Sequence, residues 1–112
     1  GAVIGVAALL APEEPSRAVA GAGEAELARL VVGSGARRRG IGRALAERCA
    51  TLARAEGWPA IALWSRPYQA AGHRLYESLG YERAPERDSV DETGFRRFVF
   101  CISLERQPPL QR

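Results

Sequence analysis

The 112-residue chain contains no lysine, no methionine, two cysteines and few aromatic residues, which make up 7% of the sequence. The cysteines, Cys49 and Cys101, lack the spacing of a disulfide framework or a zinc site, so we expect buried, reduced thiols and no metal ion. No apolar run approaches the roughly 20 residues that span a bilayer, so the sequence predicts no membrane partner. These absences together indicate a cytoplasmic protein.

The missing methionine also indicates that residue 1, a glycine, is not a translation start. The chain begins within an apolar run, so we expect a preceding N-terminal segment in the whole protein. All 16 basic residues are arginine, and the 13 acidic residues leave a net charge of +3. Hydrophobic residues make up 46%, which is enough for one folded domain with one core. We expect this domain over residues 1–104 and a polar tail over residues 105–112.

Apolar periodicity predicts alternating strands and helices. The strands are expected at residues 2–10, 24–32, 59–65, 81–84 and 95–104, and the helices at residues 40–56 and 69–79. In the first helix, an apolar stripe is formed by Ile41, Leu45, Cys49 and Leu52. The second strand, the first helix and the third strand make a strand–helix–strand unit, which favours parallel pairing of the two strands.

The turn before the first helix carries a basic, glycine-containing segment, residues 36–45 (ARRRGIGRAL). A helix N-terminus offers free backbone N–H groups and the positive end of the helix dipole, and glycine lets a ligand approach the backbone. The segment therefore predicts a binding site for a phosphorylated small molecule.

Two well-known phosphate loops do not match this segment. A P-loop needs Lys-Ser/Thr where this chain has Ile41 and Gly42, and the chain has no lysine. A dinucleotide-binding loop needs a third small residue where this chain has Leu45.

A third pattern fits. Arg37, Gly40 and Gly42 resemble the Arg-x-x-Gly-x-Gly coenzyme A pyrophosphate loop of the GNAT superfamily of N-acetyltransferases, and residues 73–81 (HRLYESLGY) resemble its Leu-Tyr-Glu-x-Leu-Gly-Phe segment. The resemblance covers about residues 1–104. It implies an α+β fold, with a mixed, mostly antiparallel sheet, one parallel strand–helix–strand unit and helices on both faces. The superfamily's leading strands and helices have no counterpart here, so this chain would be the C-terminal portion of that fold.

The resemblance implies transfer of an acetyl group from acetyl-CoA to a primary amine by direct attack, without a metal. It assigns the cofactor contacts to Leu30, Val31, Val32, Arg37, Arg38, Arg39, Gly40, Ile41, Gly42, Arg43 and Ala44. The Val32 N–H would polarise the thioester carbonyl. Gln69 stands where many relatives carry an asparagine before the second helix, and it is expected to contact the cofactor as well.

By the same resemblance, Tyr76 matches the tyrosine that protonates the departing coenzyme A thiolate. A phenol suits this role, because with a pKa near 10 it stays protonated at neutral pH. The alternative is a helix residue half-buried against the sheet. For the general base we expect Glu26, which regular alternation places on the same strand face as Val32, with Glu24 as the second candidate. The alternative is a solvated strand face. His73, the only histidine, is a further candidate base or a surface residue.

Several questions stay open at this stage. The acceptor is a small-molecule or peptide amine, and the acidic loop at residues 86–93 either favours a cationic amine or is only a polar surface. The last strand either pairs across a homodimer or packs the core. A non-catalytic acetyl-CoA-binding relative, acting as a sensor or complex subunit, is the alternative function. Nucleic-acid binding is disfavoured, because the arginine cluster is short and no aromatic residues interleave with it.

Overall fold

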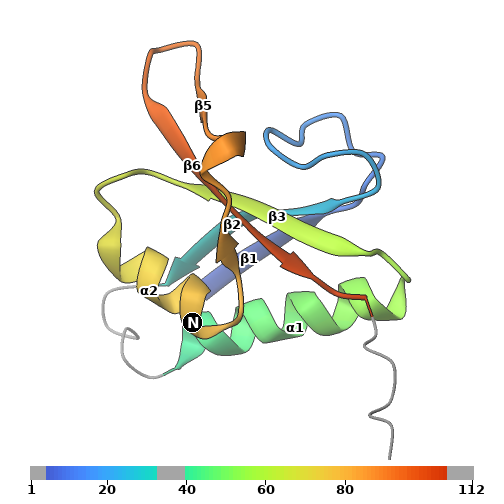
Figure 1. Ribbon diagram of the computed structural model, residues 1–112. Coiled ribbons are helices and arrows are strands. Elements are labelled where there is room, and N and C mark those ends of the chain that lie inside the picture. The colour runs from blue at the N-terminus through green and yellow to red at the C-terminus, as the bar shows by residue number, and fades with distance from the viewer. Residues whose placement is uncertain (1–4, 33–39, 106–112) are drawn as a thin grey trace, which may run out of the picture.

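The computed structural model describes residues 5–32 and 40–105. Along the chain these form β1 (Gly5–Leu10), β2 (Ala25–Val32), α1 (Ile41–Ala55), β3 (Ala60–Ser65), α2 (Ala70–Ser78), β4 (Glu82–Arg83), the 3₁₀ turn η2 (Pro85–Arg87), β5 (Ser89–Val90) and β6 (Arg96–Ser103) (Figure 1). Each predicted strand and helix is present, with described ends within one residue of the predicted ones; residues 2–4 of the first predicted strand lie outside the described residues. The sequence did not predict η2 and β5.

The strands form one mixed sheet in the order β1-β2-β3-β6-β4, and β5 pairs with β6 alongside β4. Only the β2–β3 pair is parallel, and α1 connects these two strands. The predicted strand–helix–strand unit and the mostly antiparallel sheet are therefore confirmed. Strand β6 lies inside the sheet, with β3 on one edge and β4 and β5 on the other, so its apolar residues pack the core.

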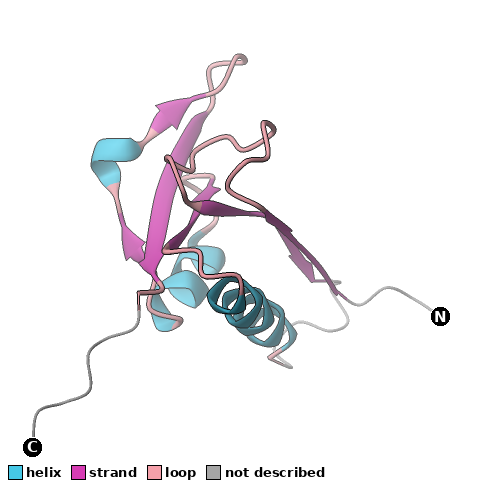
Figure 2. Cartoon of the chain, turned by 90° about the vertical axis from the view of Figure 1, so that its right-hand side faces the viewer, coloured by secondary structure: helices cyan, strands magenta, loops and turns pink. Residues whose placement is uncertain are grey.

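Both described helices pack on the same face of the sheet, which we call the helix face (Figures 1 and 2). The core lies there, where Cys49 and Ala53 of α1 and Tyr76 of α2 pack with Leu63 of β3 and Phe100 of β6. The opposite face carries no helix within residues 5–32 and 40–105. It is covered instead by the loop at residues 11–24, and we call it the loop face.

Helix α1 approaches the sheet through small side chains. Its buried residues are Ala46, Cys49 and Ala53, whereas Leu52 is 46% exposed. The predicted apolar stripe is therefore wrong at Leu52, because the helix turns its alanines toward the strands and leaves the bulkier leucine at the edge of the contact.

Both helices end at a glycine in the left-handed conformation, Gly57 with φ 79° and Gly80 with φ 98°. At each end the glycine N–H and the following N–H bond back to carbonyls of the last turn, as for Trp58 to Ala53 at 3.1 Å and Tyr81 to Tyr76 at 3.0 Å. The chain then turns directly into the next strand. Neither described helix is long and apolar enough to cross a membrane.

Candidate active site

Strands β2 and β3 diverge soon after they begin. Their parallel ladder consists of Ala25 opposite Ile61 and Glu26 opposite Ala62, whereas β3 stays paired with β6 as far as Ser65. Beyond Glu26, the edge of β2 that faces β3 has no strand partner among the described residues. This edge presents backbone N–H and C=O groups to a gap in the sheet, where an extended ligand can bind as an additional strand.

A β-bulge in β2 lies at the start of this gap. Leu9 of β1 pairs with Leu27, but the preceding Ala8 pairs with Arg29, so Ala28 is an extra residue in β2. A bulge bends its strand and increases the local twist, which carries β2 away from β3. It also interrupts the alternation of side chains, so the expectation that Glu26 and Val32 share one face loses its basis.

The N-terminus of α1 begins at Gly40, which adopts a left-handed conformation with φ 73° and ψ 13°. Among the described residues, no side chain caps the helix there, and no acidic residue lies in its first turn. The first intrahelical bond runs from the Ala44 N–H to the Gly40 carbonyl at 2.9 Å, so the N–H groups of residues 41–43 precede it. These amides suit an anion. The predicted contacts Arg37, Arg38 and Arg39 lie outside the described residues.

Tyr76 projects from α2 into the core of the helix face. Its ring lies 5.7 Å from that of Phe100 and 6.1 Å from that of Tyr81, measured between centroids. It also folds back over Gly72, where an added Cβ would meet the ring at 3.6 Å. Burial raises the pKa of the Tyr76 phenol, so the hydroxyl is protonated at neutral pH and can donate a hydrogen bond.

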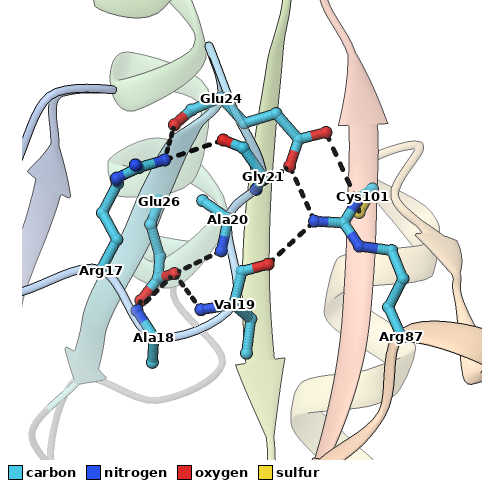
Figure 3. Close-up of polar contacts among 9 residues, drawn as sticks. All are labelled: Arg17, Ala18, Val19, Ala20, Gly21, Glu24, Glu26, Arg87 and Cys101. Atoms are coloured by element: carbon cyan, nitrogen blue, oxygen red, sulfur yellow. Dashed lines mark hydrogen bonds and ion pairs between the residues drawn. The ribbon is translucent and has the colours of Figure 1, made fainter.

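Glu26 is buried, with 2% of its surface exposed. Its carboxylate accepts hydrogen bonds from three consecutive backbone amides of the 11–24 loop: Ala18 at 2.9 and 3.0 Å, Val19 at 2.7 Å and Ala20 at 2.9 Å (Figure 3). The side chain therefore lies on the loop face but is neither solvated nor open to a substrate in this conformation. This arrangement indicates an anchor for the loop and argues against a general base.

The sequence of this chain is similar to those of known proteins. The Acetyltransferase (GNAT) family matches residues 1–81. This chain belongs to the GNAT acetyltransferase family. The N-acetylaspartate synthetase of Danio rerio is 32% identical over 97 residues, which cover 87% of this chain and 32% of that protein. The chain thus spans between about a quarter and a third of the length of the curated relatives it matches, 32% in one case and 27% in another.

Solved structures agree on the GNAT fold. Ard1 from Thermoplasma volcanium superposes with a TM-score of 0.72 at 20% identity, covering 95% of this chain and 66% of that one. The ribosomal-protein-S18-alanine N-acetyltransferase from Escherichia coli gives a TM-score of 0.62 at 25% identity, covering 80% of this chain and 60% of that one.

The 11–24 loop of this GNAT chain is fixed by further contacts around Glu26 (Figure 3). Arg17 donates to the backbone carbonyls of Gly21 at 2.8 Å and Glu24 at 2.9 Å. The Glu24 carboxylate pairs with Arg87 of η2 at 2.8 Å, and Arg87 also donates to the Val19 carbonyl at 2.8 Å. Glu24, the second candidate base, is therefore occupied by an ion pair. Local patterns did not predict these contacts, because those of Arg17 depend on the path of the loop and those of Arg87 join residues 63 and 68 positions apart.

Two polar side chains of the GNAT chain, those of Gln69 and His73, form hydrogen bonds near the start of α2. The Gln69 side-chain carbonyl accepts hydrogen bonds from the Ser65 hydroxyl at 2.9 Å and the Arg66 N–H at 2.8 Å. His73 contacts the Arg66 carbonyl at 2.9 Å through Nε2, and its ring lies 5.2 Å from Phe100. Both side chains thus hold α2 against the end of β3.

Arg43, a predicted cofactor contact, is directed toward the other helix of the GNAT chain. It donates to the Ser78 hydroxyl at 2.7 Å and lies 3.8 Å from the Glu47 carboxylate. It lines a groove of about 320 Å³ between α1 and the end of α2. Within the described residues, no group of histidine, cysteine and carboxylate side chains is arranged to hold a metal ion.

Two carboxylates of the acidic loop before β6, Asp88 and Asp91, are neutralised by arginines outside the loop. Asp88 pairs with Arg83 at 2.6 Å, and Asp91 pairs with Arg66 at 2.8 Å and accepts from Thr93. The hydrogen bond from Arg83 holds the pKa of Asp88 below its ordinary value, and that from Thr93 holds the pKa of Asp91 well below. These two carboxylates are thus used to shape the hairpin.

The paired carboxylates predict acid sensitivity. Burial acts to raise the pKa of Glu24, but hydrogen bonds from Arg87 and the Gly21 amide hold it below its ordinary 4.5. Because Glu24, Asp88 and Asp91 all have lowered folded-state pKa values, their contribution to the free energy of unfolding is complete above about pH 4.5 and is lost as the pH falls through those values. We expect the urea midpoint to fall steadily below about pH 4.5, and the fall to be shallower in Asp91→Asn. A flat profile would contradict the ion pairs.

Proposed function

We propose that this chain binds acetyl-CoA and transfers its acetyl group to a primary amine by direct attack. The observation that carries the proposal is the divergence of β2 from β3 at the bulge, with the uncapped N-terminus of α1 following along the chain. An unpaired strand edge suits the amide-containing pantetheine arm. A helix N-terminus suits the pyrophosphate. Acetyl-CoA supplies the activated acetyl group.

The residues of the chain take separate roles in this proposal. The backbone of Leu30, Val31 and Val32 lies in the part of β2 beyond the bulge and would hold the pantetheine arm. The N–H groups of residues 41–43 would hold the pyrophosphate, and the Val32 N–H would stabilise the oxyanion as the amine attacks the carbonyl carbon.

Tyr76 would act on the sulfur side of the reaction. As the carbon–sulfur bond breaks, its hydroxyl donates a hydrogen bond to the developing thiolate. One proton leaves the attacking nitrogen and one arrives at the sulfur, so the reaction is balanced. The Glu26 carboxylate accepts hydrogen bonds from three loop amides, so we assign it to anchoring the loop. We assign no described residue as the general base.

Two relatives support an amine acceptor. The names of both describe acetylation of a nitrogen atom. For N-acetylaspartate synthetase the nitrogen belongs to a small amino acid, and for ribosomal-protein-S18-alanine N-acetyltransferase it belongs to a protein. The acceptor class of this chain is therefore proposed as a small-molecule or peptide amine.

Calorimetric titration with acetyl-CoA tests the first half of the proposal, with ATP and NAD as controls. We expect selective binding in the micromolar range. Turnover on a panel of amines, followed by release of free thiol, tests the second half. Binding without any turnover would favour a non-catalytic sensor or complex subunit. An absence of binding would contradict the cofactor assignment itself.

Gly40→Ala should weaken acetyl-CoA binding about tenfold, because a Cβ at φ 73° costs about 1–2 kcal/mol and shifts the helix N-terminus. Gly57→Ala is a matched control at the other end of α1, with φ 79° and equally open surroundings. Both variants should lose similar thermal stability, but only Gly40→Ala should lose affinity. Equal affinities by calorimetry would remove the α1 N-terminus from the binding site.

A further inference from the structure

The loop face holds one half-buried arginine that has neither a carboxylate nor a backbone carbonyl as a partner among the described residues. The other half-buried arginines each have a close acceptor: backbone carbonyls for Arg17 (2.8 Å), Asp91 for Arg66 (2.8 Å), Asp88 for Arg83 (2.6 Å) and Glu24 for Arg87 (2.8 Å). In the described part of the chain, the only acceptor of Arg97 is the Ser89 hydroxyl at 3.4 Å. Its Nε is buried and has no hydrogen-bond partner within the described part of the chain.

The sheet places Arg97 on the loop face. Phe98 and Phe100 of β6 contact His73 of α2 on the helix face, so the alternate residue Arg97 points the other way. Its guanidinium carbon lies 5.4 Å from the centre of the Trp64 ring. Such stacking holds the planar group in place without using its N–H groups.

Arg97 also lies near the gap between β2 and β3. Trp64, on which it stacks, comes two residues after Ala62, the last residue of β3 that pairs with β2. Helix α1, whose N-terminus suits the phosphates, packs on the helix face. A second substrate therefore has the loop face from which to approach the gap, between the 11–24 loop and the β5–β6 hairpin, which both rise on this side (Figure 1).

A buried N–H without an acceptor is costly, and native structures rarely leave one without a reason. The Nε and Nη groups of arginine form a fork that matches the two oxygens of a carboxylate. A carboxylate from a substrate would supply the acceptor that Arg97 lacks. Arg66 and Arg96 are less suited, because Arg66 is neutralised by Asp91, and the largely exposed Arg96 lies 3.9 Å from Asp88.

We infer that Arg97 recognises a carboxylate on the acceptor, so that the preferred acceptors are amines that also carry a carboxylate. This inference rests on the proposed acetyl transfer and specifies its second substrate. Asp88 and Asp91 of the acidic loop are already paired with arginines, which reduces the repulsion that this loop exerts on such an acceptor.

The test compares amino acids with their carboxamides as acceptors, L-alanine and β-alanine against L-alaninamide and β-alaninamide. We expect kcat/KM to be roughly 10- to 100-fold higher for the acids. The amides carry the less basic amine, which is more fully unprotonated at neutral pH, so a preference for the acids cannot come from amine reactivity. Arg97→Gln should abolish the preference, Arg97→Lys should retain part of it, and the control Arg96→Gln should leave it intact.

A binding measurement covers the case in which no acceptor turns over. N-acetyl-β-alanine, but not its amide, should raise the melting temperature of the unmodified chain, and Arg97→Gln should lose this effect. Turnover of acids and amides at equal rates would overturn the inference while leaving the proposed function standing. Turnover of neither, with product stabilisation that depends on the carboxylate, would contradict the proposed catalysis and keep the Arg97 assignment. Stabilisation without such dependence would overturn the assignment.

Discussion

Replacing Glu26 with glutamine is expected to lower the melting temperature of the chain by about 10 °C or more. The carboxylate accepts hydrogen bonds from three loop amides, and glutamine would keep one acceptor oxygen but turn an NH₂ group toward buried donors. Hydrogen bonds to charged groups contribute about 1.5–3 kcal/mol each, so a loss near 3 kcal/mol is expected. In a domain of this size each kcal/mol corresponds to about 4 °C. Thermal unfolding by circular dichroism measures the change.

This substitution also separates the two roles considered for Glu26. An anchor predicts a large loss of stability together with increased proteolysis of the 11–24 loop. A general base predicts an unchanged melting temperature and a lower kcat. Glu82→Gln is the control, because Glu82 is exposed at the edge of the sheet and should change neither quantity. Preserved stability with lost turnover would restore Glu26 as the base.

Tyr76→Phe is expected to lower kcat by about 100- to 10,000-fold, the range of a lost acid–base group. The phenylalanine ring keeps the contacts with Phe100 and Tyr81, so folding should be preserved. Affinity for acetyl-CoA should change less than about twofold, because the hydroxyl acts on the leaving sulfur as the bond breaks. Assays of the initial rate of thiol release measure kcat, and calorimetry measures the affinity for acetyl-CoA, so the two effects can be separated.

Tyr81→Phe provides a matched control for this experiment. The Tyr81 hydroxyl is buried and has no hydrogen-bond partner in the described residues. Removing it should leave turnover unchanged and keep or slightly raise the stability, since an unpaired polar group is removed from the core. Equal turnover in Tyr76→Phe and the original chain would exclude Tyr76 from the reaction.

Local patterns predicted the backbone of this fold well. Helices α1 and α2 were found within one residue of the predicted ends, because apolar periodicity and the terminal glycines Gly57 and Gly80 mark them in the sequence. Strand β5 was missed, since a two-residue strand has no periodicity. It is formed by a turn in which Asp91 accepts hydrogen bonds from the Thr93 and Phe95 amides.

The candidate site was less accessible from the sequence. The bulge at Ala28 depends on the register with β1, and the sequence of β2 (AELARLVV) contains no residue typical of a bulge. Glu26 looked like a free carboxylate because its partners lie in a loop whose path no pattern specifies. Whether a charged residue is available for chemistry depends on where such loop partners lie, and only the assembled fold determines this.

The short ladder between β2 and β3 has a mechanical consequence. It divides the sheet into two parts, β1–β2 and β3–β6–β4. Within the described residues, these parts pair directly only at residues 25–26 and 61–62, and α1 packs against both. A ligand that pairs with both parts supplies the hydrogen bonds that are missing between them. Any ligand that binds only the folded state also raises the free energy of unfolding, by about 2.7 kcal/mol at a concentration of a hundred times Kd. Because the gap between β2 and β3 is also the proposed binding site, the resistance of this sheet to local unfolding depends on the ligand concentration.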